Sequence, residues 1–271
     1  WRSLKMGITK YTETAKVLFK AQIIYRFSTI VSMIFTVSRI ALAYILWSAI
    51  FDGRAVVAGF TFNAMITYYI IASFMTQMDQ SGGFGGQISS EIRNGTFSKY
   101  MVRPMNIFGN FLFQAIGVSA FLFAFNLIAA LLWVFVFRIE FVFSGDLLSV
   151  FSAVLVLSMG LLFMMQLNYF IGILAFKFLD VWIFIMIKDN LLHFLTGALI
   201  PLSLLPGNIL AVMRLFPFYY VLYLPAMLFL GKSQGETARA VVTLVCWNLL
   251  FWVLNRTTYR RLRVVYDGVG I

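Results

Sequence analysis

Apolar residues in this chain gather into long runs that short polar segments separate. Six runs are long enough to cross a lipid bilayer, which takes about 20 mostly apolar residues in a helix. They lie at about residues 27–51, 62–78, 107–137, 147–176, 181–199 and 239–254. The pattern predicts an all-α polytopic membrane protein with six transmembrane helices. No cleavable signal peptide is expected, because the first apolar run is too long for a signal core.

The apolar segment 200–230, between the fifth and sixth runs, does not fit a simple span. It holds four of the five prolines of the chain, Pro201, Pro206, Pro217 and Pro225. Proline lacks a backbone donor and breaks helices, so the pieces between the prolines are too short to cross. We expect re-entrant helices on the outer side, with their backbone covered by protein or facing water.

Composition and charge support this interpretation. The chain is 62% apolar and 11% charged, whereas an average soluble chain is about 25% charged. This excludes a soluble enzyme and a disordered chain, and the single Cys246 excludes an internal disulfide. The net charge is +11, but most of the 21 Lys and Arg residues flank the apolar runs. They fit a topology with both termini in the cytoplasm, and no nucleic-acid partner is expected.

Two segments outside the spans have amphipathic patterns. Residues 4–20 place apolar side chains at helical spacing opposite basic ones, so residues 1–26 are expected to form an amphipathic helix on the inner leaflet. An ordinary basic flank is the alternative. Residues 27–271 then form one six-span domain. The cytoplasmic loop 80–106 joins the second and third spans; its glycine cluster favours a flexible turn, because no lysine follows to complete a phosphate loop.

A short amphipathic helix follows this turn and ends at Asn94-Gly95, a good helix stop. Apolar residues exposed on a cytoplasmic loop suggest a docking surface for a partner. The apolar residues that we expect to be exposed there are Ile88, Ile92, Phe97 and Tyr100.

Ionisable residues inside the predicted spans form a candidate polar patch of Arg39, Lys188, Asp189 and His193. Such residues normally face protein or water and find a partner, and Asp189 is a plausible partner for Arg39 or Lys188. The patch either lines a translocation path or subunit seam, or is a structural ion pair. In a second register the fifth span starts near Asn190, which puts Lys188 and Asp189 at head-group level.

Other chemistry is sparse in the sequence. The lone histidine makes no metal site, and no metal is expected. The only Gly-Lys-Ser, at Gly231, lacks the upstream glycine of a nucleotide loop, so the chain has no ATP site of its own. Polar residues in the third and fourth spans are predicted to link helices by hydrogen bonds, namely Gln114, Asn126, Gln166 and Asn168.

Two local motifs carry a family resemblance. Residues 91–104, Glu-Ile-Arg-Asn-Gly-Thr-Phe-Ser-Lys-Tyr-Met-Val-Arg-Pro, resemble the cytoplasmic signature of the membrane subunit of ABC-2-type transporters, which are ATP-binding-cassette exporters. Residues 197–206, Gly-Ala-Leu-Ile-Pro-Leu-Ser-Leu-Leu-Pro, resemble the outer signature of that family, and Pro217-Phe218 and Tyr223-Leu224-Pro225 continue the match. The similarity is to a bacterial branch in which paired permeases share a separate ATPase.

The resemblance implies a role for each segment. Residues 1–26 would be a connecting helix, and residues 88–100 a coupling helix in a cleft of an ABC ATPase dimer. The coupling residues would be Ile88, Glu91, Ile92, Arg93, Phe97 and Tyr100, and the outer gate would contain Pro201, Pro206, Pro217 and Pro225.

The resemblance also implies a cellular setting. A second permease chain, identical or paralogous, would pair with this one among the lipids of the bacterial cytoplasmic (inner) membrane. ATP and Mg²⁺ would bind the ATPase, with no cofactor in this chain. The pair would export its substrate by alternating access. The aromatic-rich, weakly charged spans of the sequence suit an amphipathic or lipophilic compound, such as a drug, lipid or peptide. An ion-driven secondary transporter is the alternative, and a membrane enzyme would need catalytic residues that the sequence does not show.

Overall fold

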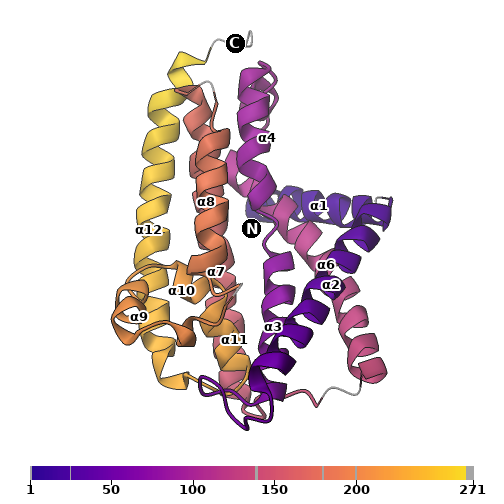
Figure 1. Cartoon of the computed structure of the whole chain (residues 1–271). Coiled ribbons are helices and arrows are strands. Elements are labelled where there is room, and N and C mark those ends of the chain that lie inside the picture. The colour runs from indigo at the N-terminus through magenta and orange to yellow at the C-terminus, as the bar shows by residue number, and fades with distance from the viewer. Residues whose placement is uncertain (1, 25, 138–139, 179, 199, 267–271) are drawn as a thin grey trace.

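The computed structural model describes residues 2–24, 26–137, 140–178, 180–198 and 200–266, and within them the chain is almost entirely helical (Figure 1). The longer helices are α1 (Arg2–Ile24), α2 (Arg26–Phe51), α3 (Phe62–Met78), α6 (Ile107–Phe137), α7 (Leu147–Ile173) and α12 (Thr237–Leu262). The shorter ones are α4 (Gly82–Arg93), α5 (Ser98–Met101), α8 (Trp182–Leu195), α9 (Gly207–Met213), α10 (Phe218–Val221) and α11 (Tyr223–Phe229). Four 3-10 turns, η1 to η4, cover Leu174–Phe176, Leu202–Leu204, Gln234–Glu236 and Arg263–Val265.

Length and apolar character mark four helical segments of the described chain as able to cross a membrane. They are Thr29–Phe51, Ile107–Leu127, Leu147–Phe176 and Gln234–Leu262. A fifth span would have to be the broken pair Gly207–Met213 and Phe218–Phe229, which bends by 84°. The multi-span helical fold is confirmed in this coarser form, and the count of six stays a prediction.

The two remaining predicted spans are short in the structure. Helix α3 has 17 residues and α8 has 14. At 1.5 Å per residue, α8 is about 21 Å long, less than the roughly 30 Å hydrocarbon core of a bilayer. The predicted fifth run 181–199 therefore forms a helix that is too short to cross a bilayer by itself.

The helices give the molecule two distinct ends (Figure 1). Helix α1 lies across the long axis, and α4 extends beyond it at the same end as the last turns of α12; we call this the α4 end. The turn between α2 and α3 lies at the opposite end, toward which α9, α10 and α11 are placed; we call this the α9 end. The role of α1 as a connecting helix along the inner leaflet remains a prediction.

Helix α7 is the centre of the packing. It makes extensive contacts with α12, α4, α11 and α10. Two of its glycines allow close approach: a Cβ at Gly160 would lie 2.9 Å from the Cα of Val221, and a Cβ at Gly172 would lie 2.9 Å from the Cβ of Ile88. Real side-chain carbons do not approach so closely. The absence of a side chain at Gly160 and Gly172 is therefore what allows α10 and α4 to lie so near α7.

The proline-rich segment folds into short helices, as its sequence predicts. Pro201, Pro206 and Pro217 stand immediately before η2, α9 and α10, and Pro225 lies in the first turn of α11. The missing N–H of proline costs nothing at such positions, because the first N–H groups of a helix have no partner within it. Helices α10 and α11 are buried against α3 and α7, so the second half of this segment belongs to the core.

Candidate functional site

Helix α4 is amphipathic, but its apolar face is turned into the protein. Ile88, Ile92 and Phe97 have no exposed surface, and Tyr100 is also buried. They pack in a cluster with residues of α6 and α7, including Phe111. The prediction that these four residues are exposed is therefore wrong, because α7 of the same chain covers the apolar face that the sequence leaves open for a partner.

The surface that α4 and α5 do expose has a different composition. We call it the α4–α5 surface, and it includes Gln87, Arg93, Asn94, Lys99, Met101 and Val102. Of the predicted coupling residues, only Arg93 is exposed there. Val102 has 81% of its surface exposed and was missed as a contact candidate, although it follows directly on the predicted coupling segment.

Glu91 holds the turn between α4 and α5 together. Gly95 has a φ of 71°, a conformation that favours glycine and allows the chain to reverse. Beyond this turn, the Thr96 hydroxyl and the Lys99 ammonium donate hydrogen bonds to the Glu91 carboxylate. Burial alone would raise the pKa of Glu91, but the bonds from Lys99 and Thr96 outweigh it and lower that pKa. Glu91 thus stabilises the chain internally.

A buried chain of polar side chains lies where α3 passes into α4. Ser81 donates to the Asp79 carboxylate, and Asn168 of α7 donates to the Ser81 hydroxyl at 2.7 Å. Lys188 of α8 donates to the Asn168 side-chain oxygen and forms an ion pair with Asp189 at 2.8 Å. This network connects the α3–α4 junction, α7 and α8, three elements that are far apart in sequence.

The predicted polar patch is only partly assembled. The Lys188–Asp189 pair is confirmed, with Lys188 buried and Asp189 half exposed. Arg39 and His193 are both exposed, and neither forms an ion pair within the residues that the structure describes. Sequence reasoning missed Ser81 as part of this network; the signal was its position two residues after Asp79 at a helix end, where such turns form.

The predicted helix-linking role of the polar span residues is confirmed for three of them by hydrogen bonds. Asn126 donates to Gln77 of α3 at 3.0 Å, and Gln166 donates to Asn248 of α12 at 2.7 Å. The third is Asn168, in the network above.

Two cavities lie beside the buried network. One, of about 490 Å³, lies between α6, α7 and the end of α3, and apolar side chains such as Phe123 and Leu162 line most of it. The other, of about 190 Å³, has a mostly apolar lining that also includes Lys188, Asp189 and His193. Both cavities reach Asp79, and only the smaller one has further ionisable side chains in its wall. A mostly apolar cavity with a few polar groups suits an amphipathic ligand.

The predicted outer-gate prolines do not form a single lining. Pro201, Pro217 and Pro225 are buried, and Pro206 is exposed. Their surroundings are aromatic and apolar, and Tyr219, Tyr220 and Tyr223 contribute buried rings. The role of these prolines in a gate stays a prediction. Among the described residues, no cluster of His, Cys, Asp and Glu side chains has the geometry to hold a metal ion.

Comparison with known proteins identifies the family. A protein-family model described as ABC-2 family transporter protein matches residues 20–270 of the chain. No curated protein matches the chain. The match covers the spanning helices, α4 and the proline-rich segment alike, in agreement with the resemblance of the two local motifs. The chain therefore belongs to the ABC-2 transporter family, as a multi-pass membrane permease subunit and not an ATPase.

Proposed function

We propose that this chain is the permease subunit of an ATP-driven exporter in a bacterial cytoplasmic membrane. A separate ABC ATPase dimer binds ATP and Mg²⁺, and a second permease chain completes the transport path. The observation that carries the proposal is the family match over residues 20–270. The basic bias of the predicted inside segments supports cytoplasmic termini, and thus a cytoplasmic α4 end.

Helix α4 couples the permease to the ATPase through its two faces. The exposed α4–α5 surface contacts the ATPase, and the buried Ile88 and Ile92 contact the rest of the permease. A tilt of α4 then displaces α7, because the two helices are in direct contact at Gly172. It reaches α8 through the hydrogen bonds of Asn168 and Lys188. ATP binding shifts the permease between two states by favouring one position of α4.

The substrate class follows from the larger cavity. Its apolar walls and the Asp79 carboxylate at one end support an amphipathic or lipophilic compound such as a drug, lipid or peptide. Alternating access would open this cavity first toward the α4 end and then toward the α9 end.

A pull-down from native membranes in mild detergent, read by mass spectrometry, tests the proposal. We expect an ABC ATPase to co-purify with the wild-type chain and to be lost from the variant Arg93→Glu with Val102→Asp. Both residues are exposed, so the changes alter the surface and leave the core intact. The matched control is Arg54→Glu, an exposed residue at the α9 end, which should keep the ATPase.

Two outcomes contradict the proposal. One is the absence of any ATPase under conditions that keep other membrane complexes intact. The other is flux that persists without ATP, depends on a proton gradient and is abolished by Asp189→Asn, which would establish the ion-driven alternative. The same purification shows whether a second permease chain is present and whether it is identical.

A further inference from the structure

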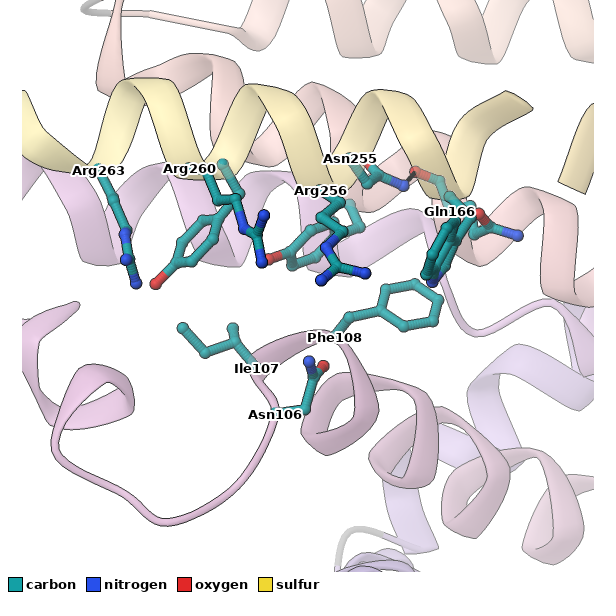
Figure 2. Close-up of a pocket in the computed structure, with 11 residues that line it drawn as sticks. Asn106, Ile107, Phe108, Gln166, Asn255, Arg256, Arg260 and Arg263 are labelled. Atoms are coloured by element: carbon teal, nitrogen blue, oxygen red, sulfur yellow. Dashed lines mark hydrogen bonds between the residues drawn. The ribbon is translucent and has the colours of Figure 1, made fainter. Parts of the chain in front are cut away.

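A third cavity, of about 510 Å³, lies at the α4 end between α12, α7 and the start of α6. Figure 2 shows Arg256 and Arg260 of α12, and Arg263 at the start of η4, projecting on one side toward the first residues of α6. Residues three and four apart lie on the same side of a helix, so the spacing of these arginines aligns all three. The cavity is separate from the α4–α5 surface and from the two cavities at Asp79.

The positive charge of this cavity is not neutralised within the described chain. No acidic residue lines the cavity, and none of the three arginines has a carboxylate partner among the described residues. Arg256 and Arg263 instead lie over the rings of Trp252 and Tyr259, at 5.3 and 5.6 Å from the ring centres. The start of α6 adds positive potential, because the N-terminus of a helix carries partial positive charge. The cavity thus favours an anion.

Two buried amides provide an independent indication of a ligand. Gln166 and Asn255 line the cavity, with only 4% and 7% of their surfaces exposed. Each uses its NH₂ group in a hydrogen bond, to Asn248 and to the Gln166 backbone oxygen respectively. The side-chain oxygens of both accept no hydrogen bond within the described part of the chain. Buried acceptors without a donor are rare. Both oxygens have almost no exposed surface, so a ligand with hydroxyl or ammonium donors would pair with them once the two side chains turn toward the cavity.

The position of the cavity identifies the source of such a ligand. The preceding turns of α12 expose Leu249, Trp252 and Val253, which is an apolar surface suited to lipid. The arginines follow directly, and two aromatic rings lie beside them. Aromatic residues next to basic ones are typical of the membrane–water interface, and basic pockets between spanning helices there bind anionic head groups.

We propose that this cavity binds the phosphate-bearing headgroup of an anionic membrane glycerophospholipid. Arg256 and Arg260 contact the phosphate, and Arg263 adds charge at the end of the site. Gln166 and Asn255 turn their side-chain oxygens toward donor groups of the headgroup. The lipid joins α12 to the start of α6. The proposal does not depend on the ATPase, since every residue of the site belongs to this chain.

Native mass spectrometry of the purified chain, delipidated in detergent and titrated with phosphatidylglycerol, tests the proposal. We expect one tightly bound lipid per chain, with affinity lowered about tenfold or more in Arg256→Gln with Arg260→Gln. Phosphatidylcholine should bind weakly, and neither inorganic phosphate nor glycerol 3-phosphate should displace the lipid. The control, Arg54→Gln with Arg239→Gln, removes two exposed arginines elsewhere and should bind as the wild type does.

A second variant tests the buried amides. Asn255→Asp keeps the shape of the side chain and adds a negative charge beside the arginines, so it should abolish phosphatidylglycerol binding. Thermal unfolding of each variant without lipid shows that it is folded.

Three results would overturn the proposal. If inorganic phosphate displaces the lipid, the site is for a soluble anion. If the arginine variant keeps the lipid but loses a co-purifying protein, the cavity is a protein interface. If the control variant weakens binding equally, the attraction is a general effect of charge and no site exists.

Discussion

Two groups of short helices, one toward each end of the molecule, pack against glycines of the same long helix, α7. The groups are α4 with α5, and α10 with α11. Helix α4 places Ile88 against Gly172 of α7, and α10 places Val221 against Gly160 of α7. Both contacts need a glycine, because any side chain on α7 would hold the short helix away. The difference lies in what surrounds each contact.

Around Gly160 the short helices are enclosed on all sides. Residues 221–228 are buried throughout, and Tyr219 and Tyr220 have almost no exposed surface. Around Gly172, α4 is buried on one face only and adjoins the polar network of Ser81 and Asn168. A helix held on one face is able to tilt, whereas an enclosed one is fixed by its neighbours. We therefore expect α4 to tilt more readily than the enclosed helices α10 and α11.

The largest expected effect comes from truncating one apolar anchor in each group. Ile92→Ala and Leu224→Ala each remove a side chain that has no exposed surface, so each should lower the free energy of unfolding by about 2–5 kcal/mol. Only Ile92→Ala should also reduce stimulation of the partner ATPase. Thermal unfolding in detergent measures the first effect and ATP hydrolysis by the co-purified complex the second. Equal ATPase losses in both variants would contradict the comparison.

Substitutions at the two glycines should distinguish the two groups of helices with a smaller loss in the free energy of unfolding. Gly160→Ala brings a methyl group against the backbone of Val221, and we expect a loss of about 1–3 kcal/mol in the free energy of unfolding. Gly172→Ala meets the side chain of Ile88 and, at 3.2 Å, the backbone oxygen of Gly85 in the same helix. A loss below that of Gly160→Ala is expected because α4, which is buried on one face only, is able to shift away from α7. Gly207→Ala, with no atom within 4 Å of the new carbon, is the control. Denaturant unfolding ranks the three, and a larger loss for Gly172→Ala would show α4 to be the fixed element.

The smallest effect concerns the turn after α4. Glu91→Gln removes the ion pair with Lys99, which should cost up to about 1 kcal/mol at neutral pH. Because the folded-state pKa of Glu91 is lowered, its carboxylate stabilises the fold above the unfolded-state pKa. That contribution is lost as pH falls through the folded-state pKa, so wild type and variant should converge below that pKa. Unfolding measured at several pH values checks this, and a difference that persists in acid would assign the stabilisation to another contact.

Helix boundaries were largely predictable from the chain alone. The apolar runs 62–78 and 107–137 coincide with α3 and α6, and 147–176 coincides with α7 and η1. Apolar length decides where a membrane helix forms, and that quantity is local. The short helices of 200–230 were equally predictable, because each proline acts on its own neighbours.

The end of the last helix, α12, could not be predicted from the local sequence. The apolar run ends near Leu254, but α12 continues to Leu262. Helical geometry in this extension and in η4, which follows it directly, aligns Arg256, Arg260 and Arg263. The sequence shows these three only as basic residues of a tail. Its continuation depends on tertiary contacts, including Tyr259 and Leu262 packed against the cluster around Phe97.

The sequence by itself determined the class of this protein, its apolar helices, its charge bias and the motifs of its family, since each of these is a property of neighbouring residues. The tertiary structure alone decided which face of α4 is covered, which partners Lys188 finds and where three arginines meet two buried amides. Those outcomes depend on helices far apart in sequence competing for the same apolar and polar surfaces. The amphipathic pattern of α4 specified that one face would be buried, and α7 was the surface that buried it.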